Sequence, residues 1–136
     1  MAKWSLPIGN YVAAAKGDLN KAARAVCLEL YTRLLIRSPV DSGRFCGNWM
    51  IGVVVIPEGF DQTKLNPSRA LDAEQLAKFM NYRLGDTIYM RNNLPYAVAL
   101  ENGHSQQAPA GVVKVTVAEF GGIVSKKARE VRSGAA

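Results

Sequence analysis

A run of apolar residues at helical spacing near the start of the chain constrains the fold most strongly. Its members recur every three or four positions: Leu19, Ala22, Ala23, Val26, Cys27, Leu30, Leu34 and Leu35. Such spacing predicts an amphipathic helix over residues 18–37, about 30 Å long. Asp18 stands where a carboxylate can cap the first turn. The helix is expected to end at Ser38-Pro39, because the residue before a proline is pushed out of the helical region.

Two further stretches have the composition of strands. Residues 48–56 are apolar and β-branched and are stopped by Pro57. Residues 87–93 form a shorter candidate, expected to pair antiparallel with another strand. Between them a second helix is predicted over residues 68–84, and residues 94–103 are expected to form one or two helical turns closed by a glycine.

The C-terminal region is predicted to be helical as well. Its apolar residues recur at a spacing near 3.6: Val113, Val117, Phe120, Val124, Ala128 and Val131. The β-branched content taken alone favours a strand over residues 112–117. Gly121-Gly122 is expected to weaken or kink the helix. These elements predict an α+β fold in which a long N-terminal helix and a C-terminal helix pack on a small, mainly antiparallel sheet.

The length of 136 residues suits one structural domain over residues 1–136. Within it we expect a flexible arm (1–7), an exposed loop (57–69) and a frayed tail (133–136). No apolar run approaches the ~20 residues that cross a bilayer, and the start of the chain lacks the apolar stretch of a secretory signal, so no membrane contact is expected.

The formal net charge is +6, from 17 basic and 11 acidic residues. The basic excess lies in residues 1–47 and 114–136, while the middle of the chain is nearly neutral. A basic balance favours a polyanionic neighbour such as DNA, through attraction to phosphates. A solvated surface is the favoured interpretation of this charge, because the sequence has no tight run of lysine and arginine.

Candidate catalytic and metal-binding groups are scarce. The sequence has no glycine-rich phosphate loop, nucleophile elbow or zinc motif. Cys27 lies on the apolar stripe of the first helix and Cys46 at a strand entrance, so both are expected to be structural. A hydrolase or metal site would have to use His104, Glu101 and Cys46, without further obvious ligands. We therefore expect a protein that is not an enzyme and holds no metal or cofactor.

Three loops, residues 38–47, 91–96 and 101–111, are dense in Asn, Asp, Ser, Gly, Pro and Gln. Such residues usually turn the chain. These loops also carry charged and aromatic side chains. An ion pair between Arg44 and Glu101 is a candidate fastener, either inside one chain or between chains.

Two large aromatic side chains are expected to supply much of the core area. Trp49 should lie on the core face of its strand, and Tyr96 should pack against the long helix. Both are therefore predicted to be largely buried.

The same loops carry three ordered signatures of one protein family. Ser38-Pro39-Val40-Asp41-Ser42-Gly43-Arg44, followed by Asn48-Trp49, resembles the "SPVDTGRxRxxW" signature of a family of tailed-phage structural proteins. Its "NNxPYAxxLExGxS" stretch is resembled by Asn92-Asn93-Leu94-Pro95-Tyr96-Ala97 and Leu100-Glu101-Asn102-Gly103-His104-Ser105. Its "QAPxG" element is resembled by Gln106-Gln107-Ala108-Pro109-Ala110-Gly111. The departures are small: Ser42 replaces the usual threonine, and Cys46 stands where many relatives have a polar or basic residue.

This family comprises minor structural, neck or tail-completion proteins of lambda-like and related long-tailed phages. The resemblance implies a non-enzymatic subunit of a homo-oligomeric ring at the head–tail junction of a virion assembled in the host cytoplasm. It implies contacts with other neck and tail proteins, among them head-completion, tail-terminator or tube proteins, and it leaves room for non-specific contact with DNA in the channel. The alternatives are a tail-terminator ring and a non-sequence-specific DNA-binding module.

By the same resemblance, the signatures supply the candidate interface and structural residues. These are Asp41, Gly43, Arg44, Trp49, Asn92, Asn93, Pro95, Tyr96, Glu101, Gly103, His104, Pro109 and Gly111.

Overall fold

The computed structural model describes residues 19–83 and 85–132. Over these residues the chain is α+β, with six α-helices, one 3-10 turn and a two-stranded antiparallel sheet. The predicted fold class is therefore confirmed. The predicted arm (1–7), the Asp18 cap and the predicted tail (133–136) lie outside the described residues.

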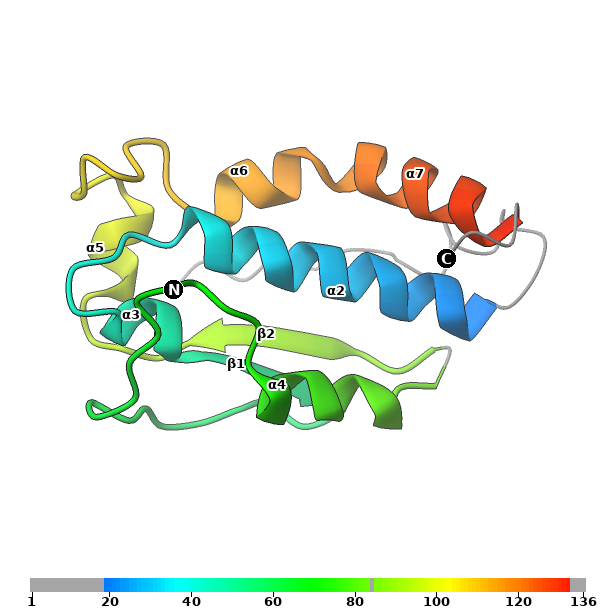
Figure 1. Cartoon of the computed structure of the whole chain (residues 1–136), viewed down its shortest axis with the longest axis horizontal. Coiled ribbons are helices and arrows are strands. Elements are labelled where there is room, and N and C mark those ends of the chain that lie inside the picture. Colours follow the sequence, from blue (N-terminus) through cyan, green and yellow to red (C-terminus); the bar gives the residue numbers. More distant parts are fainter. Residues whose placement is uncertain (1–18, 84, 133–136) are drawn as a thin grey trace.

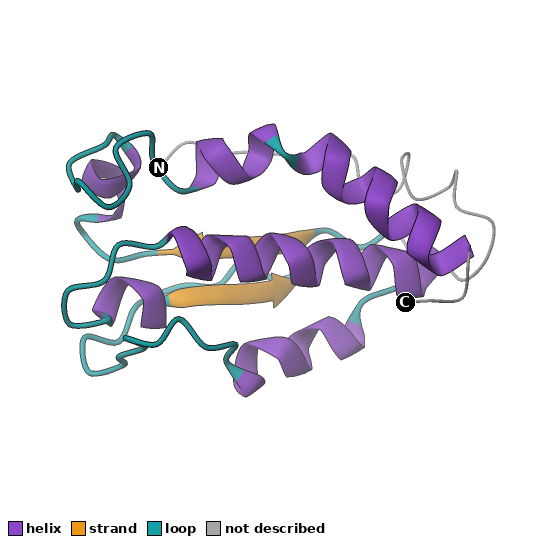
Figure 2. Cartoon of the chain, turned by 45° about the horizontal axis from the view of Figure 1, so that its top comes forward, coloured by secondary structure: helices purple, strands orange, loops and turns teal. Residues whose placement is uncertain are grey.

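Helix α2 (Leu19–Arg37) is the central element and matches the helix predicted from the periodic run. Figures 1 and 2 show it between α6 (Val113–Ala118) and α7 (Phe120–Arg132) on one side and the sheet on the other. One buried face shares a cluster with α7 and includes Ala22, Ala23, Val26 and Leu30. The other shares a cluster with the first strand and includes Cys27, Tyr31, Leu34 and Leu35. No helix in the described part of the chain is long and apolar enough to cross a bilayer.

The sheet consists of β1 (Trp49–Val53) and β2 (Ile88–Asn92). The two strands run antiparallel, and their register pairs the first residue of β1 with the last residue of β2. The strand predicted over residues 87–93 is confirmed to within one residue at each end. A cluster of buried side chains, including Trp49 and Ile51, joins β1 to α2.

The strand predicted over residues 48–56 is wrong at its C-terminal end, because β1 stops at Val53. Val54 has a positive φ of 70°, which turns the chain out of the strand. Gly52 allows the chain to fold back, because a Cβ at that position would lie 2.0 Å from the carbonyl oxygen of Val55. The end of the strand therefore depends on a close backbone approach that hydropathy does not report.

The helix predicted over residues 68–84 is much shorter in the structure. It consists of α4 (Ala73–Lys78) and the 3-10 turn η1 (Phe79–Asn81). Asn66 closes a turn before it, since its side chain accepts from the amide of Ala70 and donates to the carbonyl of Ala70. The carboxylate of Asp72 then accepts from the amide of Glu74 and caps α4, which fixes the true start of the helix.

Two short helices flank the loops. Helix α5 (Ala97–Glu101) lies inside the predicted segment 94–103 and is closed as predicted by Gly103, whose φ is 86°. Helix α3 (Arg44–Gly47) was not predicted, because four residues are too few to show a helical period. The loop over residues 57–69 is largely exposed, as expected.

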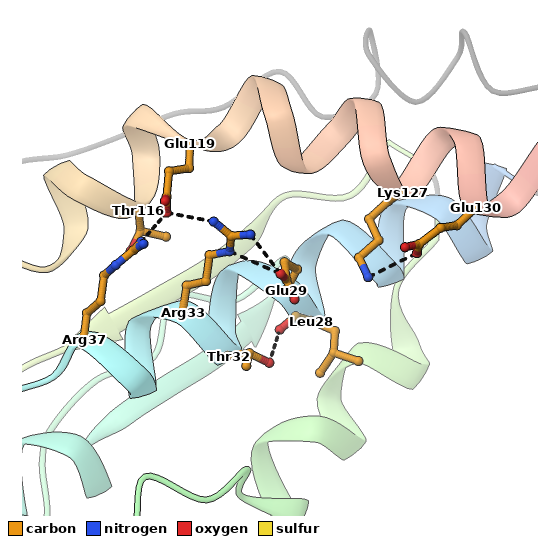
Figure 3. A network of polar contacts seen from close by, with 9 residues as sticks. All are labelled: Leu28, Glu29, Thr32, Arg33, Arg37, Thr116, Glu119, Lys127 and Glu130. Carbon is orange, nitrogen blue, oxygen red and sulfur yellow. Dashed lines mark hydrogen bonds and ion pairs between the residues drawn. The ribbon is translucent and has the colours of Figure 1, made fainter. Parts of the chain in front are cut away.

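The C-terminal region is helical as predicted, but its break is elsewhere. The chain leaves helix α6 at Glu119 and continues as α7, whereas Gly121-Gly122, the predicted kink, lies inside α7. Glu119 points toward α2, where it forms ion pairs with Arg33 and Arg37 (Figure 3). The break therefore coincides with a residue held by the neighbouring helix.

Candidate interaction site

The first and third signatures are joined by a side-chain clamp. The carboxamide of Gln107 accepts from the amide of Val40 and donates to the carbonyl of Val40, both at 2.9 Å. Arg69 reinforces this clamp, since its Nε donates to the carbonyl of Ser38 at 3.1 Å and its Nη2 donates to Gln107 Oε1 at 3.2 Å. Two loops about 67 residues apart are therefore held as one unit.

Glu101 joins the second signature to the residues that directly follow the third signature. Its Oε1 accepts from the amides of Val112 at 2.9 Å and Val113 at 2.8 Å, and its Oε2 accepts from the amide of Lys114 at 2.9 Å. These amides belong to the first turn of α6, which has no intrahelical acceptor for them. The carboxylate thus serves as a cap supplied from another segment of the chain.

Two glycines make this arrangement possible. Gly111 has a φ of 87°, and a Cβ there would lie 2.5 Å from the carbonyl oxygen of Glu101. Gly103 has a φ of 86°, and a Cβ there would lie 2.4 Å from the carbonyl oxygen of Pro109. A larger residue at either glycine would have a strained backbone, and its Cβ would push apart the two chain segments that meet here. Four of the candidate residues therefore form one interlocked loop.

A third glycine and its neighbours fix the first signature against the long loop. Gly43 has a φ of 93°, and a Cβ there would lie 2.5 Å from the backbone nitrogen of Pro67. Its carbonyl accepts from the amides of Gly47 at 2.9 Å and Asn66 at 2.8 Å. This close approach packs the exposed loop onto α3.

Side chains of the strands complete the framework. Trp49 Nε1 donates to Ser38 Oγ at 2.7 Å, and its ring packs edge-on against Phe45 with centroids 5.6 Å apart. The prediction that Trp49 is buried is confirmed. Asn92 is also buried, and its Nδ2 donates to the carbonyl of Phe45 at 2.7 Å. Asn93 Nδ2 donates to the carbonyl of Pro57 at 3.2 Å.

The prediction that Tyr96 is buried against the long helix is wrong. The side chain is 39% exposed and its ring lies beside Phe45, with centroids 6.4 Å apart, instead of beside α2. Leu94 and Ala97 occupy the buried positions on either side of it. Because the side chains of Leu94 and Ala97 are both buried, the chain between them turns the side chain of Tyr96 toward solvent.

The proposed ion pair between Arg44 and Glu101 does not form within the described chain. Arg44 Nε donates instead to the carbonyl of Gln62 at 3.0 Å. Both carboxylate oxygens of Glu101 are engaged by backbone amides. Within the described chain, the carboxylate of Glu101 therefore caps α6 and does not pair with Arg44. An ion pair between Arg44 of one chain and Glu101 of another stays a prediction.

Some of the signature residues lie around a groove of about 330 Å³ between the loops. We call it the signature groove. Its walls include Val40, Phe45, Tyr96 and Leu100, and Asp41 and Arg44 also line it. Ser42, Ser105 and Gln107 add polar groups. Pro95, His104 and Pro109 are exposed but do not line the groove. The lining therefore mixes apolar side chains with polar ones, including one acidic and one basic group, as protein–protein contact surfaces do.

The two cysteines lie inside the fold, where structural cysteines are expected. Both are buried, and burial raises the pKa of the Cys27 thiol to about 12 and that of the Cys46 thiol to about 11. A nucleophilic cysteine needs a lowered pKa instead. His104, Glu101 and Cys46 form no common cluster, since the described residues contain no group of three potential metal ligands.

A second hollow of about 290 Å³ was not anticipated from the sequence. It is lined by Tyr31, Cys46, Leu65 and Leu71, among others, and by Lys64 and Asp72, which form an ion pair of 2.6 Å. Burial raises the pKa of the Tyr31 hydroxyl to about 12, so its phenol stays protonated at neutral pH.

Charge is divided unevenly between the layer formed by α2, α6 and α7, which we call the helical layer, and the rest of the described chain. The segments of α2, α6 and α7 (residues 19–37 and 113–132) hold nine basic and three acidic residues. Residues 38–112 hold six basic and seven acidic residues. The basic excess of the described chain therefore belongs to the helical layer, and the signature groove lies in the nearly neutral part.

No protein-family model, no curated protein and no solved structure matches this chain. What the signature groove can do must therefore be inferred from its own chemistry.

Proposed function

We propose that this chain is a structural subunit of a tailed-phage virion. It acts at the head–tail junction as a neck or tail-completion protein, where copies form a ring that helps join the tail to the head. One observation carries the proposal: three signatures spread over residues 38–111 come together around one groove. If these loops served only to reverse the chain direction, they would have no need to meet at one site.

The way the loops are fixed supports an assembly role. The clamp by Gln107, the cap by Glu101 and the glycines at 43, 103 and 111 hold the loops in one conformation before any partner arrives. A surface that is already ordered loses less conformational entropy on binding. Tyr96, which is exposed, and Arg44, which is partly buried, both line the groove and are residue types enriched at protein interfaces.

A ring requires each copy to offer two different surfaces to its neighbours. In the proposed ring the signature groove is one of these surfaces. The other neck and tail proteins, such as a head-completion, tail-terminator or tube protein, contact the remaining faces. A tail-terminator ring is the alternative position for the same kind of subunit.

The proposal is tested in the phage that encodes the chain. Deleting the gene is expected to leave filled heads and separate tails in electron micrographs, and adding the purified protein should restore joined particles. Tyr96→Asp, which places a charge in the groove, should fail to restore them. Ile36→Asp, at a 61% exposed position on α2, is the matched control and should restore them. Joined, infectious particles in the deletion strain would contradict the proposal.

A DNA-binding module is the second candidate, and the charge of the helical layer favours it. Exposed Lys114, Lys126 and Arg129 lie on α6 and α7, in the layer that holds the basic excess. Such a surface attracts phosphates without reading bases. Duplex binding that weakens steeply with salt, together with dispensability for joining, would favour this candidate.

A further inference from the structure

The chain between β1 and α4 includes a long segment that buries no side chain. None of residues 60–71 is buried, and the three large apolar side chains among them, those of Phe60, Leu65 and Leu71, are 44%, 52% and 45% exposed. We call residues 60–71 the strap. Burial of apolar surface is the main force that holds a segment to a fold, so the strap must be held in another way.

Hydrogen bonds fasten the first half of the strap to the first signature. The side chain of Asn48 donates to the carbonyl of Asp61 at 2.9 Å and accepts from the amide of Asp61 at 2.8 Å. Arg44 Nε donates to the carbonyl of Gln62 at 3.0 Å. Such bonds are exchanged for bonds to water when a segment moves away, so each one holds the strap only modestly.

Arg69 fastens the second half of the strap. Its Nε donates to the carbonyl of Ser38 at 3.1 Å, and its Nη2 donates to Gln107 Oε1 at 3.2 Å. Its backbone has a φ of 60°, a conformation that residues other than glycine rarely adopt. Backbone strain of this kind persists only where the surrounding structure imposes it. Loss of the two side-chain bonds would therefore release strain as well as the strap.

A hollow lies beneath the strap. It has a volume of about 290 Å³, and its inner wall includes Tyr31 of α2 and Cys46 of α3, which are each 1% exposed. The strap supplies the outer wall, including Lys64 and Leu65. Protein interiors are otherwise close-packed. The strap therefore does not form a close-packed interface with the helices under it.

We infer that the strap opens as a unit while the rest of the described fold stays folded, and that this opening exposes Tyr31 and Cys46. Segments with few buried apolar contacts open at a lower free energy than the whole fold. The strap has no buried side chain, whereas Cys27 and Leu35 of α2 are at most 1% exposed. This opening is a property of the single chain and does not depend on the proposed assembly role.

The two cysteines of the chain report the opening. Cys46 lines the hollow under the strap, whereas Cys27 is fully buried in the core cluster that joins α2 to β1. Iodoacetamide should therefore alkylate Cys46 at least about tenfold faster than Cys27, because only global unfolding exposes Cys27. Mass spectrometry of the digested chain measures both rates.

Arg69→Gln is the test variant, and Arg24→Gln is its matched control. Arg24 Nη2 also donates to a backbone carbonyl, that of Tyr82 at 3.1 Å, but neither residue belongs to the strap. Loss of the two bonds of Arg69 should speed alkylation of Cys46 by about tenfold and leave that of Cys27 unchanged. Arg24→Gln should not change the rate at Cys46.

A change in thiol chemistry cannot imitate this result. Burial raises the pKa of the Cys46 thiol to about 11, and the charge of Arg69 opposes that rise. Loss of the charge alone would therefore leave less of the reactive thiolate and slow the alkylation of Cys46.

Circular dichroism and urea unfolding establish that each variant is folded. Arg44→Gln, which removes the single bond to Gln62, is the second test variant and should speed alkylation of Cys46 by about fivefold. Equal rates at the two cysteines of the unmodified chain would overturn the inference, because Cys46 would then be exposed only by global unfolding. So would an unchanged rate at Cys46 in the folded test variants.

Discussion

Glu101 is the single side chain on which the order of the loops depends most. Replacing it with alanine removes the acceptor of three backbone amides at the start of α6. We predict that Glu101→Ala lowers the free energy of unfolding by about 2 kcal/mol in urea titrations. Glu101→Gln keeps one oxygen as an acceptor and should cost about half as much. Equal stability of the alanine variant and the unmodified chain would contradict the capping role.

The glycines allow a matched comparison. Gly111→Ala places a Cβ 2.5 Å from the carbonyl of Glu101, whereas Gly59→Ala, at a φ of 73°, has no neighbouring atom within 4 Å. Gly59→Ala should cost about 1 kcal/mol from backbone conformation alone. Gly111→Ala should cost at least about 2 kcal/mol, because a collision is added. Both losses are measured by urea unfolding, and equal losses would show that the loop relaxes freely.

At the scale of elements, an ion-pair network ties α6 and α7 to α2 (Figure 3). Glu119 pairs with Arg37 and, at 2.9 Å, with Arg33, which also pairs with Glu29 at 3.1 Å. The hydrogen bond from Arg37, and to a lesser extent that from Arg33, lowers the pKa of Glu119 to about 2. The network thus couples helix packing to pH.

The sign of that coupling gives a prediction. Because the carboxyl of Glu119 titrates near 2 in the folded chain and near 4.5 when unpaired, its contribution to stability is complete above pH 4.5. That contribution is lost as the pH falls toward 2. The unmodified chain should therefore be more stable than Glu119→Gln in urea at pH 6, and the difference should vanish near pH 2. A difference that does not depend on pH would contradict the assignment.

The elements that could be predicted are those whose own residues show the pattern of a helix or a strand. Helix α2 has an uninterrupted apolar period, and β2 begins with Ile88 and Tyr89, residue types common in strands, so both follow from local pattern. The end of β1 does not, because it depends on Val54 bonding to Thr87 across the sheet. Likewise α4 starts late because Asn66 closes a turn upstream, which a helical period cannot reveal.

The sequence predicted which residues belong to the candidate site, but it did not predict what each residue contacts there. The signatures pointed to Glu101 and Gly111 as interface or structural positions, yet their pairing across the loop depends on tertiary structure. Gln107 was not among the candidate residues, although it clamps Val40, because its amide could equally face solvent. Tyr96 was expected inside and lies at the surface.

At the scale of the whole molecule, basic charge and most of the large exposed apolar side chains lie in different segments of the described chain. The helical layer holds the basic excess of the described chain. Seven large exposed apolar residues instead lie between residues 54 and 80: Val54, Val55, Ile56, Phe60, Leu65, Leu71 and Met80.

The charged layer can be tested with matched arginines. Arg129 lies exposed on α7, and Arg83 lies exposed in the segment before β2. If the helical layer contacts DNA, Arg129→Gln should weaken binding to a short duplex and reduce the salt slope of log K by about 1. Arg83→Gln should change neither quantity. Fluorescence anisotropy across a salt series measures both, and equal effects would remove the helical layer as the contact surface.

The central claim is that this chain fastens copies of itself into a junction between head and tail. The measurement that tests it most directly is the position and number of copies in an intact particle, determined by averaged electron cryomicroscopy of virions carrying a labelled chain. The account predicts a closed ring of label where the tail meets the head. Complete, tailed particles that contain no copy of the chain would contradict it.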